Sequence, residues 1–323
     1  MIHISLPKSD TRRLSFYLAM EEFVARNINQ DEDCFFMWQG EPSVIFGRNQ
    51  LIENEVNLDF CRNHGIKTYR RKSGGGCVYA DMSNIMFSYV TKDEAVGFTF
   101  NRYINMVVLV LQKLGVDARA SGRNDIMIGD RKVSGNAFYH IPGRSIVHGT
   151  MLYDTDMVNM VGAITPNDEK LVSKGVASVR QRIALLKDFI NIDIEQFKTF
   201  VRNNLCQSEI TLGEEDVKGI EEIEKEYLTD EFVYGNNPKY TIIKKGRIDN
   251  VGEFQIRIEA KNGVIKAMTM LGDYFIVGNI DDIVRPLKGV ELTWDAMAKA
   301  LPEKLDKTIM NLKKQDFLSL ILG

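Results

Sequence analysis

The chain has 323 residues, of which 44% are hydrophobic and 26% charged, and its formal net charge is −3. This length fits a large catalytic domain with a small appended domain, and the composition excludes wholesale disorder. Because the net charge is slightly negative and no basic run is long, general polyanion binding is excluded and no nucleic-acid partner is expected.

The N-terminal segment Met1–Asp10 lacks the basic-then-apolar pattern of a signal peptide. The most apolar run, Ile104–Leu111, is too short to span a bilayer. The four cysteines form no C-x-x-C pair, and the four histidines lack metal-ligand spacing. These features predict a cytoplasmic protein with reduced thiols, no structural zinc site and no membrane association.

In the N-terminal part, Asp10 can cap a helix over Thr11–Asn27, where apolar residues recur at helical spacing. Two apolar runs, Cys34–Trp38 and Ser43–Phe46, are separated by Gly40-Glu41-Pro42, which favours a hairpin. Further strands are expected at Ile66–Arg70, Cys77–Tyr79 and Ile85–Val90.

The middle of the chain begins with a predicted helix over Phe100–Leu114, ended by Gly115. Two short strand patterns then flank Gly129-Asp130, and a glycine at the first turn position suits a type II′ hairpin. The strands expected here are Ile126–Ile128, Lys132–Ser134 and Ile146–Tyr153. The pattern is helical over Asp154–Leu228, including Ile194–Leu205 and Glu214–Tyr227.

The C-terminal part begins after Gly235-Asn236-Asn237-Pro238, where polar and apolar residues start to alternate. The expected elements are strands at Thr241–Lys244, Glu253–Ala260 and Val264–Leu271, a hairpin turn at Asn262-Gly263, and helices at Ile280–Leu287 and Thr293–Ala300. A boundary near Asn237–Lys245 predicts a catalytic domain over residues 1–240 and an accessory domain over residues 241–323.

A glycine triplet, Gly74–Gly76, directly follows Ser73 and the cations Arg70, Arg71 and Lys72. Consecutive glycines are costly for folding, but they let the backbone approach a ligand and point N–H groups at an anion. The spacing matches neither a P-loop nor a Rossmann fingerprint. The pattern predicts a phosphate-cradling loop of another kind, and a tight surface turn with incidental charge is the competing interpretation.

Two later segments carry further candidates. Lys132 opens a strand directly after a tight turn, and Ser134-Gly135 would let the backbone pass close to another group. A lysine held on a strand can stabilise charge that develops on a phosphate or carboxylate, although a lone lysine at a hairpin is usually a solvated surface residue. His148 could act as a base, but a histidine at the end of a strand more often makes structural hydrogen bonds.

In this order, four segments together resemble the motifs of the lipoate–protein ligase A family. They are Arg70–Asp81, Ser121–Asp125, Lys132–Ala137 and His148–Leu152, with supporting matches at Leu18–Glu22, Val44–Gln50 and Lys174–Arg180. The resemblance covers most of the first 240 residues. Each glycine motif alone is weak, whereas the combination is highly specific.

The sequence departs from the family pattern at two positions of the first motif. Ala80 stands where the family usually has a histidine, so any role of that imidazole is absent or supplied elsewhere. Cys77 stands where alanine is common. Packing is the preferred interpretation of this thiol, and a thioester-forming nucleophile is the alternative.

The resemblance implies a mixed α/β catalytic domain rich in antiparallel strands, similar to biotin ligases and class II aminoacyl-tRNA synthetases, plus a small accessory domain. It implies an ATP-dependent, AMP-forming ligase. Such an enzyme activates lipoate as lipoyl-AMP, releases pyrophosphate, and transfers the lipoyl group to a lysine of an apo lipoyl domain. The implied carriers are 2-oxoacid dehydrogenase E2 subunits, the glycine-cleavage H protein or both. Mg²⁺ would hold the pyrophosphate, with ligands that stay unidentified, and the preference for lipoate or octanoate stays open.

The resemblance also implies roles for individual residues. Lys132 would be catalytic, contacting the lipoate carboxylate and the α-phosphate, and Arg71 would help to offset the repulsion between these anions. The apolar runs Val44–Phe46 and Val78–Tyr79 could line a slot for the acyl chain. The implied substrate- and ATP-binding residues are Arg71, Ser73, Gly74, Gly75, Gly76, Cys77, Val78, Tyr79, Asn84, Asp125, Lys132, Ser134, Gly135 and His148.

Two alternatives remain at this stage. An ATP-independent octanoyl or lipoyl transferase is disfavoured because Leu271–Phe275 and Ile283–Gly289 resemble the accessory domain that transferases usually lack. A non-catalytic lipoyl- or nucleotide-binding protein is disfavoured because Lys132 and the glycine triplet are retained. The accessory domain is expected to close over the adenylate and to rotate about Tyr234–Tyr240 between half-reactions. A monomer is the default expectation.

Overall fold

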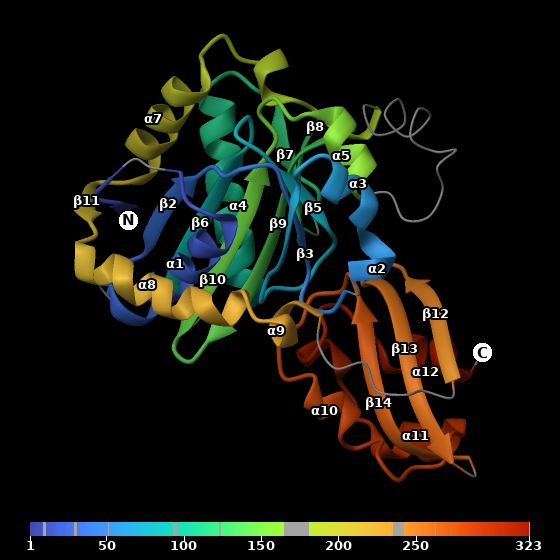
Figure 1. Ribbon diagram of the computed structural model, residues 1–323. Coiled ribbons are helices and arrows are strands. Elements are labelled where there is room, and N and C mark those ends of the chain that lie inside the picture. Colours follow the sequence, from blue (N-terminus) through green and yellow to red (C-terminus); the bar gives the residue numbers. More distant parts are fainter. Residues whose placement is uncertain are drawn as a thin grey trace. The chain divides into compact units, whose positions relative to one another are not determined.

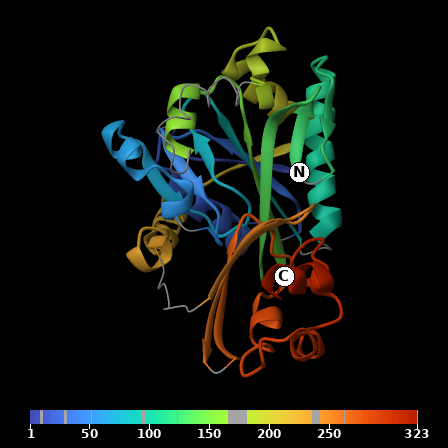
Figure 2. The same cartoon turned by 90° about the vertical axis from the view of Figure 1, so that its right-hand side faces the viewer.

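The chain divides into two compact units in the computed structural model (Figures 1 and 2). The larger unit comprises Met1–Ile45, Glu53–Arg71 and Val78–Val233, and the smaller comprises Phe46–Ile52, Lys72–Cys77 and Tyr234–Gly323. Two loops from the first quarter of the sequence therefore belong with the C-terminal residues. The structure describes residues 1–8, 11–28, 31–50, 52–92, 96–122, 124–164, 181–234, 242–261 and 263–322.

The larger unit is built on an eight-stranded sheet with the order β11-β1-β2-β6-β10-β9-β8-β7. Strand β1 runs parallel to β2 and β11, and the other neighbouring strands pair antiparallel. The predicted mixed α/β fold with an antiparallel-rich sheet is confirmed. The strands are β1 (Ile2–Ser5), β2 (Cys34–Trp38), β6 (Ile85–Lys92), β7 (Ala118–Ala120), β8 (Asp125–Ile128), β9 (Arg131–Ile141), β10 (Arg144–Met151) and β11 (Ser208–Thr211).

Helices cover both faces of this sheet (Figures 1 and 2). Helix α1 (Leu14–Asn27) packs on β6 and β10 and against α8 (Glu214–Tyr227), while α4 (Val96–Lys113) packs on β7, β8 and β10. Every residue of β10 is consequently buried. The remaining helices are α2 (Ile52–Glu55), α3 (Leu58–Asn63), α5 (Met157–Ile164), η2 (Leu186–Asp188), α7 (Ile194–Leu205) and α9 (Asp230–Tyr234). None of the helices described in the chain combines the length and apolar character needed to cross a bilayer.

A separate three-stranded sheet, ordered β4-β3-β5, consists of β3 (Ser43–Phe46), β4 (Lys67–Arg70) and β5 (Val78–Ala80). The predicted hairpin between the second and third strands of the chain is wrong. Strand β2 lies between β1 and β6 in the main sheet, so both of its edges are already paired and β3 must find other partners. It pairs antiparallel with β5 instead.

Other sequence predictions need smaller corrections. The first helix begins at Leu14 after the extended residue Arg13, and Asp10 lies outside the described residues. Strands β1 and β11 fall in segments where no strand was predicted. The Gly129 turn is confirmed, because Ile128 and Arg131 pair across it and Gly129 has a φ of 58°. The family-like segment Lys174–Arg180 and the expected hinge residues 235–240 lie outside the described part of the chain.

The smaller unit has its own three-stranded sheet and hydrophobic core. Along β13, buried residues alternate with more exposed ones, as expected for a sheet with one covered face. The predicted hairpin between β13 and β14 is confirmed, although Asn262 of its turn is outside the described residues. The elements are β12 (Ile242–Ile248), β13 (Gly252–Lys261), β14 (Val264–Gly272), α10 (Asp281–Val284), α11 (Trp294–Ala300), η3 (Leu305–Lys307) and α12 (Lys314–Leu322).

Candidate active site

The predicted site residues fall into two groups, one in each unit. The smaller unit holds the loop Ser73–Cys77. The larger unit holds the rest of the group: Arg71, Val78, Tyr79, Asn84, Asp125, Lys132, Ser134, Gly135 and His148.

An ion pair between Lys132 and Asp125 joins the neighbouring strands β9 and β8. Lys132 Nζ is 2.8 Å from Asp125 Oδ1, and the two side chains are 35% and 28% exposed. Asp125 opens β8 opposite Gly135 of β9. The ammonium is thus fixed by a partner yet open on one side, which distinguishes Lys132 from a freely solvated surface lysine.

An irregularity in the β8–β9 pairing directs the Lys132 side chain. The partners of Ile126 and Met127 are two residues apart on β9, so Val133 is an extra residue in that strand. Since side chains alternate along a strand, one extra residue lets Lys132 and Gly135 share a side. A Cβ atom at Gly135 would lie 2.6 Å from Lys132 Nζ. Gly135 therefore provides room for the lysine itself, which the sequence motif alone did not reveal.

His148 lies in a buried hydrogen-bond network. Its Nδ1 is 2.8 Å from Glu21 Oε2, and Glu21 Oε1 accepts a hydrogen bond of 2.6 Å from Ser88 Oγ. Ser88 Oγ in turn accepts one from Trp38 Nε1 at 2.9 Å. The network joins α1 to strands β2, β6 and β10. This arrangement supports the structural interpretation of His148.

The candidates on and beside β5 lie in a packed environment. Arg71 is buried, and its Nη1 donates a 3.0 Å hydrogen bond to the Ile45 carbonyl. Val78 pairs with Ile45, and Tyr79 pairs with Val44, so the two apolar runs predicted to line an acyl slot are neighbouring strands. Burial, followed by the nearby charge of Asp81, raises the pKa of Tyr79 above its usual value. The phenol is therefore neutral at physiological pH.

Two further candidates, Asn84 and Ser134, are also buried. Asn84 Nδ2 donates to Thr155 Oγ1 at 2.5 Å, and Ser134 Oγ donates to Asn136 Oδ1 at 3.3 Å. Asn136 and Glu21 were not among the predicted site residues. A carboxylate at position 21, inside an apolar helical stripe, was the available sign of a buried polar network.

In the smaller unit, the glycine triplet contacts the segment after β14. A Cβ atom at Gly74 would lie 2.5 Å from the Tyr274 carbonyl oxygen. Gly75 has a φ of 87°, which favours glycine, and its N–H donates to the same carbonyl at 3.4 Å. Gly76 has room for a Cβ, 3.9 Å from that of Asp273. Two of the three glycines thus have structural reasons in addition to any ligand role.

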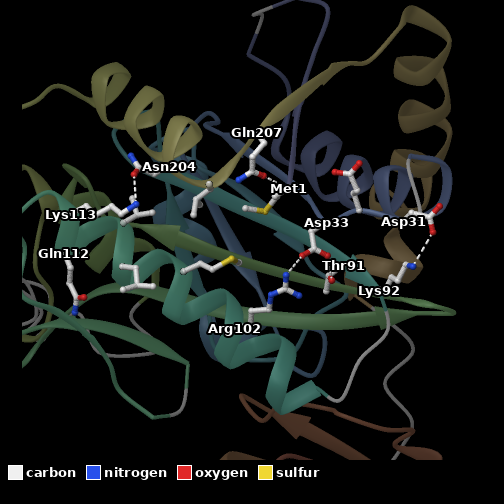
Figure 3. A pocket seen from close by; sticks show the side chains of 15 residues that line it. Met1, Asp31, Asp33, Thr91, Lys92, Arg102, Gln112, Lys113, Asn204 and Gln207 are labelled. Carbon is white, nitrogen blue, oxygen red and sulfur yellow. Dashed lines mark hydrogen bonds and ion pairs between the residues drawn. The ribbon is translucent and has the colours of Figure 1, made fainter.

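A cavity of about 910 Å³ lies beside α4 and contains none of the predicted site residues (Figure 3). Its charged lining is paired internally. Lys92 Nζ lies 3.3 Å from Asp31, and Arg102 Nη2 lies 2.9 Å from Asp33. These two ion pairs occupy part of the charged lining, and the cavity is separate from the candidate site.

Comparison with known proteins covers both parts of the chain. The model of the lipoyl protein ligase A/B catalytic domain matches residues 14–206, and that of the bacterial lipoate protein ligase C-terminus matches residues 237–321. Lipoate–protein ligase 1 of Staphylococcus aureus is 36% identical over 294 residues, which cover 88% of this chain and 89% of the relative.

Two solved structures extend the comparison. A bipartite lipoate protein ligase from Thermoplasma acidophilum, studied with its E2 lipoyl domain, is 29% identical with a TM-score of 0.66 and covers 75% of this chain and 99% of its own. A lipoate–protein ligase A bound with ATP is 27% identical with a TM-score of 0.63, covering 72% and 98%. The chain belongs to the lipoate–protein ligase family.

Proposed function

We propose that this ligase activates lipoate as lipoyl-AMP at the site around Lys132 and then lipoylates a lysine of an apo lipoyl domain. The single observation that carries the assignment is the Lys132 ammonium, held 2.8 Å from Asp125 Oδ1 and open on one side. The relative bound with ATP supports the nucleotide substrate. The relative studied with its E2 lipoyl domain supports an E2 subunit as the carrier, and the glycine-cleavage H protein is a second candidate carrier.

In the first half-reaction, a lipoate carboxylate oxygen bonds to the α-phosphorus, and the bond from that phosphorus to the pyrophosphate breaks. Two anions must approach each other, so a preorganised cation lowers the barrier. Lys132 would contact both the carboxylate and the α-phosphate, with its ammonium moving from Asp125 toward the forming bond. Arg71 would supply the second positive charge, held by its hydrogen bond to the Ile45 carbonyl.

The proposed site fits a Mg²⁺ ion carried by the nucleotide. Among the residues that the structure describes, no group of three or more His, Cys, Asp or Glu could cage a metal. Mg²⁺ in nucleotide sites needs only one or two carboxylates besides phosphate and water ligands. Asp125 is the carboxylate of the proposed site and would be able to hold it. The ion would neutralise charge on the departing pyrophosphate.

In the second half-reaction, the neutral amine of the carrier lysine attacks the acyl carbon. The new C–N bond forms, the amine loses a proton to solvent water, and the bond from the acyl carbon to the AMP oxygen breaks. Nδ1 of His148 is engaged by Glu21, so we assign His148 a structural role here. Ser134 and Gly135 would shape the strand beneath the adenylate. The proposed lipoate contacts are Val78, Tyr79 and Asn84 in the larger unit and the loop Ser73–Cys77 in the smaller unit.

We further propose a catalytic domain over residues 1–240 and an accessory domain over residues 241–323. The gap between the two family matches, at residues 207–236, supports a division in this region. The smaller unit also includes Phe46–Ile52 and Lys72–Cys77, so the loop proposed to bind lipoate packs with C-terminal residues. The proposed setting is the cytoplasm, which the four free cysteines support, and the proposed oligomeric state is a monomer.

Intact-mass spectrometry of an apo E2 lipoyl domain tests this function. The domain is incubated with the enzyme, lipoic acid and Mg²⁺, with and without ATP. A lipoyl mass gain that requires ATP is expected. A gain from an acyl-carrier donor without ATP, and none from free lipoate, would make the protein a transferase and direct attention to Cys77. If neither mixture modifies the E2 domain or the H protein, the catalytic proposal is wrong.

A further inference from the structure

Two asparagines, Asn124 and Asn136, clamp the start of β8 onto β9. Asn136 Nδ2 donates to the Asn124 carbonyl at 2.9 Å, and Asn124 Nδ2 donates to the Asn136 carbonyl at 3.0 Å. The backbone N–H of Asn136 also donates to the Asn124 carbonyl at 3.0 Å. Three reciprocal hydrogen bonds therefore join these residues, although they lie twelve positions apart.

The Asn136 amide occupies a space that the surrounding strands keep open. The residue is only 3% exposed, and its Oδ1 accepts the hydrogen bond from Ser134. Gly149 lies opposite it on β10, and a Cβ atom there would be 1.9 Å from Asn136 Oδ1. Gly149 does not have a positive φ, so glycine is needed here for space and not for its backbone conformation.

The clamp holds both members of the Lys132–Asp125 pair. Asn124 directly precedes Asp125, and Asn136 directly follows Gly135, the residue beside which Lys132 Nζ lies. Upstream of the clamp, Ser121 and Gly122 are exposed. Two hydrogen bonds tie Asp125 to this loop: its N–H donates to Ser121 Oγ at 3.1 Å, and the Ser121 N–H donates to the Asp125 carbonyl at 2.9 Å.

We propose that Asn136 and Asn124 are positioning residues that set where Asp125 holds the Lys132 ammonium before adenylate formation. This inference rests on the proposed function of Lys132. A loosened clamp would let Asp125 and Lys132 move together away from the place where the carboxylate meets the α-phosphorus. A displacement of about 1 Å between the catalytic group and the reacting atoms can lower a rate by about 100-fold.

The test is a double-mutant cycle on single-turnover formation of lipoyl-AMP from lipoate and ATP. Asn136→Ala should slow this step by about 10–100-fold in the wild-type background. If Asn136 acts through Lys132, the same substitution should have little further effect in the Lys132→Ala background. An equal loss in both backgrounds would overturn the inference. A normal rate for Lys132→Ala alone would instead overturn the proposed function of Lys132, so the two failures are distinguishable.

A packing control separates positioning from stability. In Asn136→Ala/Gly149→Ala the added methyl group refills the space left by the amide without restoring its hydrogen bonds. Recovery of the melting temperature with a rate that stays low supports positioning, whereas joint recovery of both overturns it. Asn105→Ala, on the exposed side of α4, is the matched control and should retain the wild-type rate.

A second variant covers the case in which Asn136→Ala fails to fold. Asn124→Ala removes only the Nδ2 donor and leaves both bonds to its backbone carbonyl. It should slow adenylate formation by about 2–10-fold, the effect of one hydrogen bond. A wild-type single-turnover rate for folded Asn124→Ala would contradict the proposed role of the clamp.

Discussion

The larger unit contains two polar side-chain pairs that have the same length and differ in burial. Lys132 Nζ lies 2.8 Å from Asp125 Oδ1, and His148 Nδ1 lies 2.8 Å from Glu21 Oε2. The first pair has side-chain exposures of 35% and 28%, while the second has exposures of 7% and 0%. Distance alone therefore does not separate a pair that serves chemistry from one that serves the fold.

Solvent access explains the difference. The Lys132–Asp125 pair is partly exposed, and a fully exposed ion pair contributes about 0–1 kcal/mol, so Lys132 can exchange Asp125 for an anionic substrate at a small cost in stability. Breaking a buried pair leaves an uncompensated group in the interior, which costs about 3–5 kcal/mol. Glu21 and His148 therefore remain together and hold α1 against the sheet, while Lys132 stays available.

The largest effect is expected for Lys132→Ala. Removal of one preorganised charge should slow lipoyl-AMP formation by about 10²–10⁴-fold. Unfolding in urea should change by no more than about 1 kcal/mol, because the lost pair is partly exposed. Quenched-flow measurement of the adenylate, alongside the unfolding curve, checks both. A fast variant would remove Lys132 from the mechanism, and a strongly destabilised one would remove the contrast between the pairs.

Glu21→Ala should show the reverse pattern. It leaves His148, Ser88 and the helix interface without their shared acceptor, and we expect a loss of about 3–5 kcal/mol in unfolding free energy. The adenylation rate per folded molecule should stay near the wild-type value. Glu215→Gln, in the exposed Lys218 pair on α8, is the control and should leave stability unchanged. A stable Glu21→Ala variant would contradict the structural assignment of this network.

Gly135→Ala tests the comparison by displacing the Lys132 ammonium without removing it. Its Cβ would lie 2.6 Å from Lys132 Nζ, the flexible end of a side chain that can move aside. Stability should therefore change little, while adenylate formation slows by about 10–100-fold because the ammonium is displaced. Calorimetry and single-turnover kinetics on one preparation check this. Loss of the native fold with a normal rate per folded molecule would show that Gly135 is needed for packing instead.

The smallest effect is expected for Asp125→Asn. The substitution keeps the size of the side chain and removes one charge of a partly exposed pair, so the free energy of unfolding should fall by about 0–1 kcal/mol. Raising the salt concentration should reduce the difference between wild type and variant, since exposed charges are screened. Urea unfolding at two salt concentrations measures both. A loss above about 3 kcal/mol would mean that this pair behaves as a buried one.

Much of the fold and family could be predicted because the signals are local. The Gly129 turn, the helix that ends before Gly115 and the order of the four motifs are all written in short stretches of sequence. The pairing partners of the strands are not written in such short stretches. The pairing of β3 with β5, and the placement of β2 inside the main sheet, depend on which edges remain free after distant strands have paired.

The site shows the same limit. The motif identifies Lys132, but the extra residue Val133, which directs its side chain, appears only when β8 and β9 are aligned. Glu21 and His148 are 127 positions apart, so no local pattern predicts their contact. The Gly74 contact with the Tyr274 carbonyl is likewise a long-range feature. These are packing relationships, whereas the motif reports only residue types.

The most direct test of the contrast between the two pairs is the single-turnover rate of lipoyl-AMP formation per folded molecule, measured side by side for Lys132→Ala and Glu21→Ala. We predict a large loss of rate for Lys132→Ala and a near-normal rate for the Glu21→Ala molecules that remain folded. Equal losses in the two variants would contradict the account, because the buried pair would then serve the chemistry as directly as the exposed one.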